Sequence, residues 1–375
     1  MNQEKNITET DIKLILSGEI GPESISKIES KFNNIKYYDF KPLIKRIFDL
    51  GEGYPLNHSS ADIGIMGRLN RIGRKRKNRK FLTRYLTNKT KKEAIVIVSE
   101  GDSWFEYPLF LKDIVDWLIK LTKYSVYSIA SGGDWLGNIL YNGDYIHELS
   151  LYRPDVFLIS GGGNDLVGGS RISLLVKERK DIDIELSDAE KTLYETYLKA
   201  GYQNEYAHKL IIGRKFLNKD FWALLNVFRF QYYLIFKNLE SSGKFNSLKI
   251  ITQGYEAPLP SSNRNILINP MRAIMKNGRW LDQPLRLRGI QDTGEKRAIL
   301  ATMMHEFNEM LIDIGKKNKN VFHIDCRGFA KNESDWFDEL HLKSKFFKQI
   351  ALTYIECIES KDSNKKVFRV ASNKP

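Results

Sequence analysis

The 375-residue sequence predicts an α/β protein built on an open, doubly wound parallel sheet with helices on both faces. Two observations support this fold class. From residue 94 onward, short and almost continuous apolar runs recur, and stretches with apolar residues at every third or fourth position separate them. Such runs are typical of strands buried on both faces, and their alternation with helices favours parallel pairing. We therefore expect a three-layer α/β/α arrangement.

Five segments match the pattern of a buried strand. The first, AIVIVS at residues 94–99, is rich in β-branched residues, which favour extended backbone. The others lie at residues 124–130, 155–160, 247–254 and 320–325. Helical periodicity is clearest at residues 109–122, after the first strand, and at residues 134–152, after the second.

A long segment between the third and fourth strands, about residues 170–245, predicts a helical insertion. Its first part begins with Ser187 and carries Glu190 three residues later, which is the pattern of a helix capping box. Its second part, FWALLNVFRFQYYLIFKNL, is rich in aromatic residues. An insertion here would lie beside the carboxyl ends of the strands, where such sheets bind ligands. The aromatic side chains would then line an acyl pocket, or they would only fill the core.

Both ends of the chain differ from the expected α/β domain at residues 93–360. Residues 1–92 predict a basic, mainly helical appendage, because helical spacing occurs in IKLILSGEI at 12–20 and in YYDFKPLIKRIFDLGEG at 37–53. Residues 361–375 are mostly polar and predict a C-terminal tail.

The net charge of +13 is unevenly distributed along the chain. The first 93 residues hold 20 Lys and Arg against 11 Asp and Glu, and residues 68–92 hold 12 basic residues and no acidic one. Such a block attracts phosphate, on nucleic acid or on anionic lipid. A solvated linker and a helix face packed on an acidic surface are the alternatives.

The overall composition, 42% hydrophobic and 28% charged, is typical of a globular protein. The two cysteines, Cys326 and Cys357, are too few for a disulfide framework and lack metal-binding spacing, which favours a reducing compartment. The N-terminus lacks the apolar core of a signal peptide, and no apolar run approaches the roughly 18 residues of a spanning helix. We therefore expect a cytoplasmic protein. Export without a signal peptide is left open as an alternative.

Ser103 is the first candidate catalytic residue, because VSEGDSWFEYP at residues 98–108 places it directly after the first strand. A serine hydroxyl becomes a nucleophile only beside a general base, and acyl transfer also needs donors for the oxyanion. The next two strands end in SGGD at 131–134 and GGGND at 161–165, which offer backbone N–H groups and the Asn164 amide. A phosphate-binding loop is disfavoured, because the G-x-G-x-x-G order is absent.

A candidate base follows the last expected strand. In WFDELH, Asp338 and His341 are three residues apart, close enough for the carboxylate to bond imidazole Nδ1 and fix its tautomer. The other histidines lack such a partner, and we expect them to be structural or exposed. They are His58, His147, His208, His305 and His323.

Four short motifs follow predicted strands in the order GDSWF, SGGD, GGND and DELH. In this order they resemble the blocks of the SGNH (GDSL-type) hydrolase superfamily, over residues 94–356. The wider stretches EGDSWFEYP, ISGGGNDLVGG, ITQGYEAPLP and WFDELH are similar to a bacterial subgroup of that superfamily. The resemblance implies a flavodoxin-like sheet, with Ser103 as the nucleophile, His341 as the base and Asp338 as its orienting partner.

The resemblance also implies an oxyanion hole. The backbone N–H of the nucleophilic serine would be one donor, that of Gly133 a second, with Gly132 the competing alignment, and the Asn164 amide the third. Two positions depart from the family pattern. Leu342 follows the histidine where proline is common, and Gln253 stands where the nearest relatives would have a histidine.

The expected function is hydrolysis of a carboxylic ester through an acyl-enzyme, without a metal or an organic cofactor. Acetylated carbohydrates, short acyl esters, lipids and thioesters are the candidate substrates. An acyltransferase would use the same chemistry. An alternative of a different class is a non-enzymatic module that binds an anionic membrane or nucleic acid through residues 68–92. The sequence does not indicate an oligomeric state.

Overall fold

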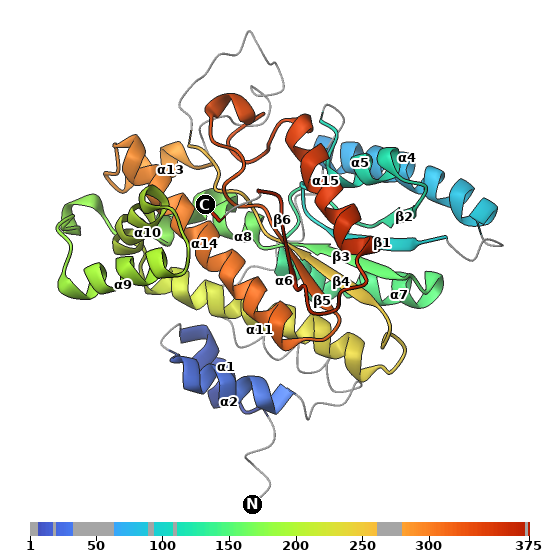
Figure 1. Ribbon diagram of the computed structural model, residues 1–375, viewed down its shortest axis with the longest axis horizontal. Coiled ribbons are helices and arrows are strands. Elements are labelled where there is room, and N and C mark those ends of the chain that lie inside the picture. Colours follow the sequence, from blue (N-terminus) through green and yellow to red (C-terminus); the bar gives the residue numbers. More distant parts are fainter. Residues whose placement is uncertain are drawn as a thin grey trace, which may run out of the picture.

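The protein is built around a six-stranded sheet in which all neighbouring strands are parallel, in the order β2-β1-β3-β4-β5-β6 (Figure 1). The computed structural model describes residues 7–17, 20–32, 64–88, 94–107, 111–260, 280–371 and 374–375. The strands are β1 (Val96–Gly101), β2 (Ser125–Ser128), β3 (Val156–Ser160), β4 (Lys249–Gln253), β5 (Val321–Asp325) and β6 (Val367–Arg369). The predicted α/β class with a parallel sheet is confirmed, with one strand more than expected.

The central strands are apolar on both faces, as their β-branched runs predict. All five residues of β3 are buried, and Ile97 of β1 lies in register between Val126 of β2 and Val156 of β3. Because all strands run in the same direction, the loops that follow them meet at one edge of the sheet. The four motifs singled out in the sequence follow β1, β2, β3 and β5 and therefore lie at this carboxyl edge.

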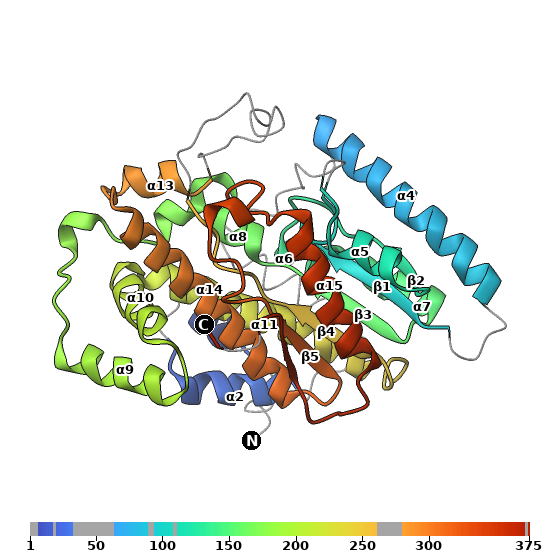
Figure 2. The same cartoon turned by 45° about the horizontal axis from the view of Figure 1, so that its top comes forward.

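Helices cover both faces of the sheet (Figures 1 and 2). On one face α5 packs against α15, and on the other α6 packs against α11. Their bounds are α5 (Ile114–Leu121), α15 (Ser344–Glu359), α6 (Leu136–Asn142) and α11 (Lys219–Ser241). Helices α7 (Asp144–Tyr152), α8 (Gly163–Val167), α13 (Asp282–Leu287) and α14 (Thr293–Lys317) complete the crossovers.

The predicted insertion folds as α9 (Asp188–Lys199), α10 (Asn204–Phe216) and α11. The capping box is present, since Glu190 N–H donates to Ser187 Oγ over 3.4 Å and Ser187 N–H donates to Glu190 Oε2 over 2.8 Å. The aromatic residues of α11 are mainly core residues: Phe228 and Tyr232 are fully buried. Among the described residues, none of α11 lines the cavity beside Ser103.

Two N-terminal helices, within the range where the sequence predicts an appendage, pack onto the α/β part of the molecule. Helices α1 (Glu9–Ser17) and α2 (Pro22–Phe32) lie against α11 (Figure 1). Glu29 of α2 forms an ion pair with Lys317 of α14, with 3.0 Å between Oε2 and Nζ. The helix expected at residues 37–53 lies outside the described residues.

Helix α4 (Gly64–Asn88) covers the free edge of strand β2 (Figure 2). The Asn78 amide donates to the backbone carbonyl of Ser128 and accepts from its N–H, each over 2.9 Å, which substitutes for a neighbouring strand. Phe81 packs edge-on against Tyr127. The buried face of α4 is largely polar, so hydropathy does not mark it.

The C-terminal segment is also more ordered than its composition predicts. Residues 367–369 form β6 and pair in parallel with β5, and Phe368 is almost fully buried. The prediction of a polar tail over residues 361–375 is therefore wrong for this strand. Three residues are too short a run to show the alternation of a strand.

The cysteines and the helices bear on two further expectations. Cys326 and Cys357 are buried free thiols, and burial raises the pKa of each above its ordinary value. Neither is therefore a candidate nucleophile, because the reactive form of cysteine is the thiolate. Across the described ranges, the helices lack the combination of length and apolar character that crossing a bilayer requires.

Candidate active site

The carboxyl edge of the sheet brings together three side chains whose types match a nucleophile, a base and an orienting acid. Ser103 lies in the turn after β1, and Asp338 and His341 lie in the loop between β5 and α15. His341 Nε2 is 2.6 Å from Ser103 Oγ. His341 Nδ1 is 2.8 and 2.9 Å from the two carboxylate oxygens of Asp338. This is the arrangement in which an imidazole can take the proton of a serine hydroxyl.

The loop that carries Asp338 and His341 is tightly closed. Asp338 Oδ1 accepts from the backbone N–H groups of Leu340 and His341, each over 2.8 Å. Leu342, where the family commonly has proline, is buried and pairs with Trp336 in a short antiparallel bridge. Burial opposes the charge on Asp338, but the His341 ring and the two N–H donors outweigh it and lower the pKa of Asp338. The carboxylate therefore stays ionised.

Tyr107, which the sequence analysis did not assign to the site, supports the same carboxylate. Its hydroxyl donates to Asp338 Oδ2 over 3.2 Å, and its ring lies edge-on to the His341 ring with 4.7 Å between centroids. Burial and the nearby Asp338 charge raise the pKa of Tyr107, so its hydroxyl remains a donor. Its position four residues after Ser103 is the only sequence signal for this role.

Two of the three expected oxyanion donors, those of Ser103 and Asn164, come from residues that line one cavity. Asn164 is the second residue of the short helix α8, and its side-chain amide donates to the carbonyl of Asp134 over 2.9 Å. A primary amide carries a second hydrogen, which is the one available to an oxyanion. Gly133 precedes Asp134 with φ at 91°, a left-handed conformation that favours glycine. Neither Gly133 nor Gly132 is among the described residues that line the cavity.

The cavity beside Ser103 is small and mainly apolar. Its volume of about 30 Å³ has room for roughly two water molecules. Its apolar walls are Trp104, Val167, Tyr255, Met304 and Leu340. A small, mainly apolar space next to a serine hydroxyl suits a short acyl group better than a long chain.

A buried cluster around Asp102 braces the turn that carries Ser103. Asp102 Oδ2 accepts from Tyr255 Oη over 2.6 Å, and Oδ1 accepts from the Trp104 N–H over 3.0 Å and from Ser160 Oγ over 3.3 Å. Burial raises the pKa of Asp102. These residues were not predicted as a group, although each follows or ends a predicted strand. Their position at strand ends was the available signal.

The remaining histidines occupy positions where they serve the core or the surface. His305 and His323 are buried, and burial lowers their pKa values to about 3 and about 4, so both are neutral at pH 7. His147 and His208 are exposed. His58 lies outside the described residues. The expectation of structural or exposed histidines therefore agrees with the four that the structure describes.

The site combines a hydroxyl, a base with its carboxylate, and a side-chain amide that lines the same cavity. These groups suffice for nucleophilic acyl transfer. Within the ranges that the structure describes, no group of three or more His, Cys, Asp or Glu side chains could hold a metal ion. No protein-family model matches the chain, and no curated protein matches it either. The geometry of the site and the fold therefore carry the functional argument.

Proposed function

We propose that the protein is a serine ester hydrolase of the SGNH type, with a flavodoxin-like three-layer fold. The observation that carries the proposal is the chain of contacts from Ser103 Oγ to His341 Nε2, and from His341 Nδ1 to Asp338, at 2.6 and 2.8 Å. The parallel sheet and the order of the site residues along the chain, Ser then Asp then His, are consistent with the resemblance stated above.

In the first half of the proposed reaction, His341 Nε2 takes the proton of Ser103 Oγ while the oxygen attacks the ester carbonyl. The oxyanion accepts hydrogen bonds from the backbone N–H groups of Ser103 and Gly133 and from the Asn164 amide. When the tetrahedral intermediate collapses, the imidazolium gives its proton to the departing alcohol. The acyl group is then bound to Ser103 as an ester.

In the second half, a water molecule replaces the alcohol. His341 removes one proton from the water as it attacks the acyl-enzyme, and then returns a proton to Ser103 Oγ as the carboxylic acid leaves. Asp338 holds the neutral ring with Nδ1 protonated and stabilises the imidazolium in each half. Tyr107 keeps the carboxylate in place from the other side.

The size of the cavity favours substrates with a short acyl group. A space of about 30 Å³ between Trp104 and Met304 fits a group the size of acetyl, whereas a fatty acyl chain needs a much larger apolar pocket. Among the candidate substrates, acetylated carbohydrates and short acyl esters are therefore favoured over lipids.

A series of p-nitrophenyl esters with acetyl, butyryl and octanoyl groups tests the proposal. We expect kcat/KM to fall as the acyl chain lengthens, and Ser103→Ala to abolish turnover of all three. Hydrolysis by Ser103→Ala at the wild-type rate would refute the proposed function. Adding a primary alcohol and measuring the ester formed distinguishes an acyltransferase from a hydrolase, because only the former prefers the alcohol to water.

A second candidate function, binding to an anionic membrane surface, is favoured by a groove between α4 and α5. The groove has a volume of about 590 Å³. Basic side chains that line it include Arg76, Lys80, Lys112 and Lys120. Large apolar side chains, Ile72, Leu82 and Leu86, are also exposed on α4. A helix that carries both cations and exposed apolar side chains suits the headgroup region of a bilayer.

Binding to vesicles tests this second function. We expect vesicles rich in phosphatidylserine to retain the protein at low salt, and retention to weaken steeply as salt rises. The triple variant Lys80→Gln, Lys112→Gln, Lys120→Gln should lose retention and keep ester hydrolysis. Equal retention of this variant, or stronger binding to DNA than to the vesicles, would contradict a membrane role.

A further inference from the structure

Helix α4 reaches the active site, although the sequence pattern places it in an appendage. It runs along β2, and its N-terminal half lies at the carboxyl edge of the sheet (Figure 2). The residues that face inward, Asn70, Gly73, Lys77 and Phe81, are all buried. Their spacing of three and four positions places them on one face of the helix. Two of these side chains contact the loops that carry the candidate catalytic residues.

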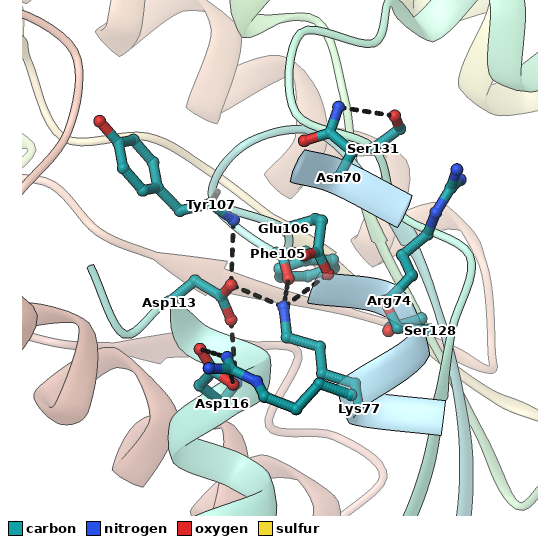
Figure 3. Close-up of polar contacts among 12 residues, drawn as sticks. Asn70, Arg74, Lys77, Phe105, Glu106, Tyr107, Asp113, Asp116, Ser128 and Ser131 are labelled. Atoms are coloured by element: carbon teal, nitrogen blue, oxygen red, sulfur yellow. Dashed lines mark hydrogen bonds and ion pairs between the residues drawn. The ribbon is translucent and has the colours of Figure 1, made fainter. Parts of the chain in front are cut away.

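Lys77 is bonded to the loop that follows Ser103. Its ammonium group donates to the Phe105 carbonyl over 2.7 Å, to Glu106 Oε2 over 2.7 Å and to Asp113 Oδ2 over 2.6 Å (Figure 3). The Lys77 side chain is only 1% exposed, and a lysine so buried needs such partners because desolvation disfavours its charge. Asp113 and Glu106 outweigh desolvation and raise the pKa of Lys77. All three hydrogens of the ammonium therefore have acceptors.

These contacts connect Lys77 to the catalytic acid. Asp113 Oδ2 also accepts from the backbone N–H of Tyr107 over 3.0 Å (Figure 3). Asp113 Oδ1 caps α5 through the N–H of Asp116, so the carboxylate is held by a rigid element. The hydroxyl of Tyr107 donates to Asp338. Lys77 thus fixes residues 105–107. Ser103 lies just before this segment, and Tyr107, which supports Asp338, lies at its end.

Asn70 holds the second loop. Its amide Nδ2 donates to the Gly132 carbonyl over 3.1 Å. The same nitrogen donates to Ser131 Oγ over 3.2 Å (Figure 3). Gly132 directly precedes Gly133, the proposed oxyanion donor. The turn continues to Asp134, whose carbonyl accepts from Asn164. The Asn70 side chain therefore fixes the turn of residues 131–134. This turn contains Gly133 and contacts Asn164, so it connects the two proposed oxyanion donors other than Ser103.

Glycine at position 73 allows α4 to lie close to the Glu106 side chain of the nucleophile loop. A Cβ atom built there would lie 1.9 Å from Glu106 Oε1. Any larger residue would displace Glu106 or move the helix away from the loop. The small size of Gly73 thus permits the close approach of α4 and the loop after Ser103, in addition to the polar contacts of Lys77 and Asn70.

We propose that Lys77 and Asn70 are positioning residues, which hold the nucleophile loop and the oxyanion turn in register with each other from a single helix. The inference rests on the proposed function, because register matters only if Ser103 and Gly133 act on the same carbonyl. Catalytic groups must be held to within a fraction of an ångström, and misplacement by about 1 Å can cost about 100-fold in rate. Neither residue touches the substrate in this proposal.

The test compares Lys77→Met and Asn70→Ala with Arg84→Met as the control. Arg84 also joins α4 to the sheet, through the carbonyls of Tyr124 and Ile119, but at the end of β2 away from the site. We expect kcat for p-nitrophenyl acetate to fall at least about tenfold in the first two variants with KM within about twofold of wild type. The control should keep the wild-type kcat.

Hydrogen exchange provides a readout that does not depend on activity. We expect faster exchange at residues 105–107 in Lys77→Met and at residues 131–134 in Asn70→Ala, with both regions unchanged in Arg84→Met. Wild-type kcat in both folded variants would overturn the proposal. If Lys77→Met does not fold, Asn70→Ala tests the positioning role by itself, because this variant removes no charge.

The two proposals fail in different ways. If the wild-type protein shows no Ser103-dependent turnover, the proposed function fails, and the exchange measurements alone decide the positioning role. Unchanged exchange in both loops would then overturn it, and faster exchange confined to those loops would support it. If the wild type is active and both variants match it, only the positioning role fails.

Discussion

His341 and His323 show how neighbouring groups decide what a buried histidine does. Both are almost completely buried, at 3% and 0% exposed, and both belong to β5 or the loop after it. The ring nitrogens of His341 face a carboxylate and a serine hydroxyl. Those of His323 face neutral groups, Thr252 Oγ1 at 2.9 Å and Asn308 Oδ1 at 3.3 Å. Only the first set of partners can hold a ring that repeatedly gains and loses a proton.

The largest effect is expected from changing the carboxylate that distinguishes the two histidines. Asp338→Asn keeps the size of the side chain but no longer fixes Nδ1 of His341 as the protonated nitrogen. We expect kcat to fall by about 10⁴, as when a triad carboxylate is replaced elsewhere. Steady-state kinetics with p-nitrophenyl acetate measures it. A loss below about tenfold would show that Asp338 does not orient the base.

A smaller loss is expected when an oxyanion donor is removed. Asn164→Ala should lower kcat by about 10²–10³ with KM little changed, because the amide acts mainly on the transition state. Asn138→Ala is the matched control, since the Asn138 amide also donates to Asp134, at its carboxylate Oδ1 over 3.0 Å, but Asn138 does not line the cavity. Equal rates in the two variants would remove Asn164 from the site.

Tyr107→Phe tests the support of Asp338 with a smaller change. The variant loses one hydrogen bond to an ionised group, and we expect kcat to fall about three- to tenfold. Tyr124→Phe provides the control, because its hydroxyl donates to Glu359 over 2.6 Å at the start of β2 and the end of α15, away from the carboxyl edge of the sheet. If kcat falls equally in both variants, the loss in Tyr107→Phe is not specific to the triad.

His323 should affect stability at acidic pH and leave catalysis unchanged. Burial lowers its pKa from 6.5 to about 4, so the unfolded chain takes up a proton below pH 6.5 and the folded protein does not. Stability is complete above pH 6.5 and falls as the pH drops toward 4, by up to about 1.4 kcal/mol per pH unit from this group. His305 adds a loss of the same sign.

The variant His323→Asn should therefore show a shallower loss of unfolding free energy between pH 6.5 and 4, with kcat at pH 7 within about twofold of wild type. Urea unfolding at several pH values measures the slope. An unchanged slope would mean that His323 is protonated in the folded protein.

The strands and the triad candidates were predictable because each is a local signal. The strands are continuous apolar runs, and Ser103, Asp338 and His341 follow strands in short motifs. The support of the triad was not predictable, since Tyr107 and Asp102 act through contacts with residues more than a hundred positions away. Such contacts follow from how the chain folds back on itself, and no local pattern encodes them.

Helix α4 shows a different limit of sequence reasoning. Lys77 and Lys80 are three residues apart in the same basic run, yet Lys77 is buried and Lys80 is exposed. Residue type alone indicates a solvated position for both. The inward face is marked by Asn70, Gly73 and Lys77, which are polar or small, so a search for apolar periodicity does not find it. The acidic partners of Lys77, which are Glu106 and Asp113, lie in another segment of the chain.

The central claim, that His341 activates Ser103, is tested most directly by covalent labelling with a fluorophosphonate probe. Peptide mass spectrometry should find the wild-type protein modified at Ser103. His341→Ala should slow the labelling by orders of magnitude, and His323→Asn should label at the wild-type rate. Absence of modification at Ser103 in the folded wild type, or equal labelling rates in all three proteins, would contradict the claim.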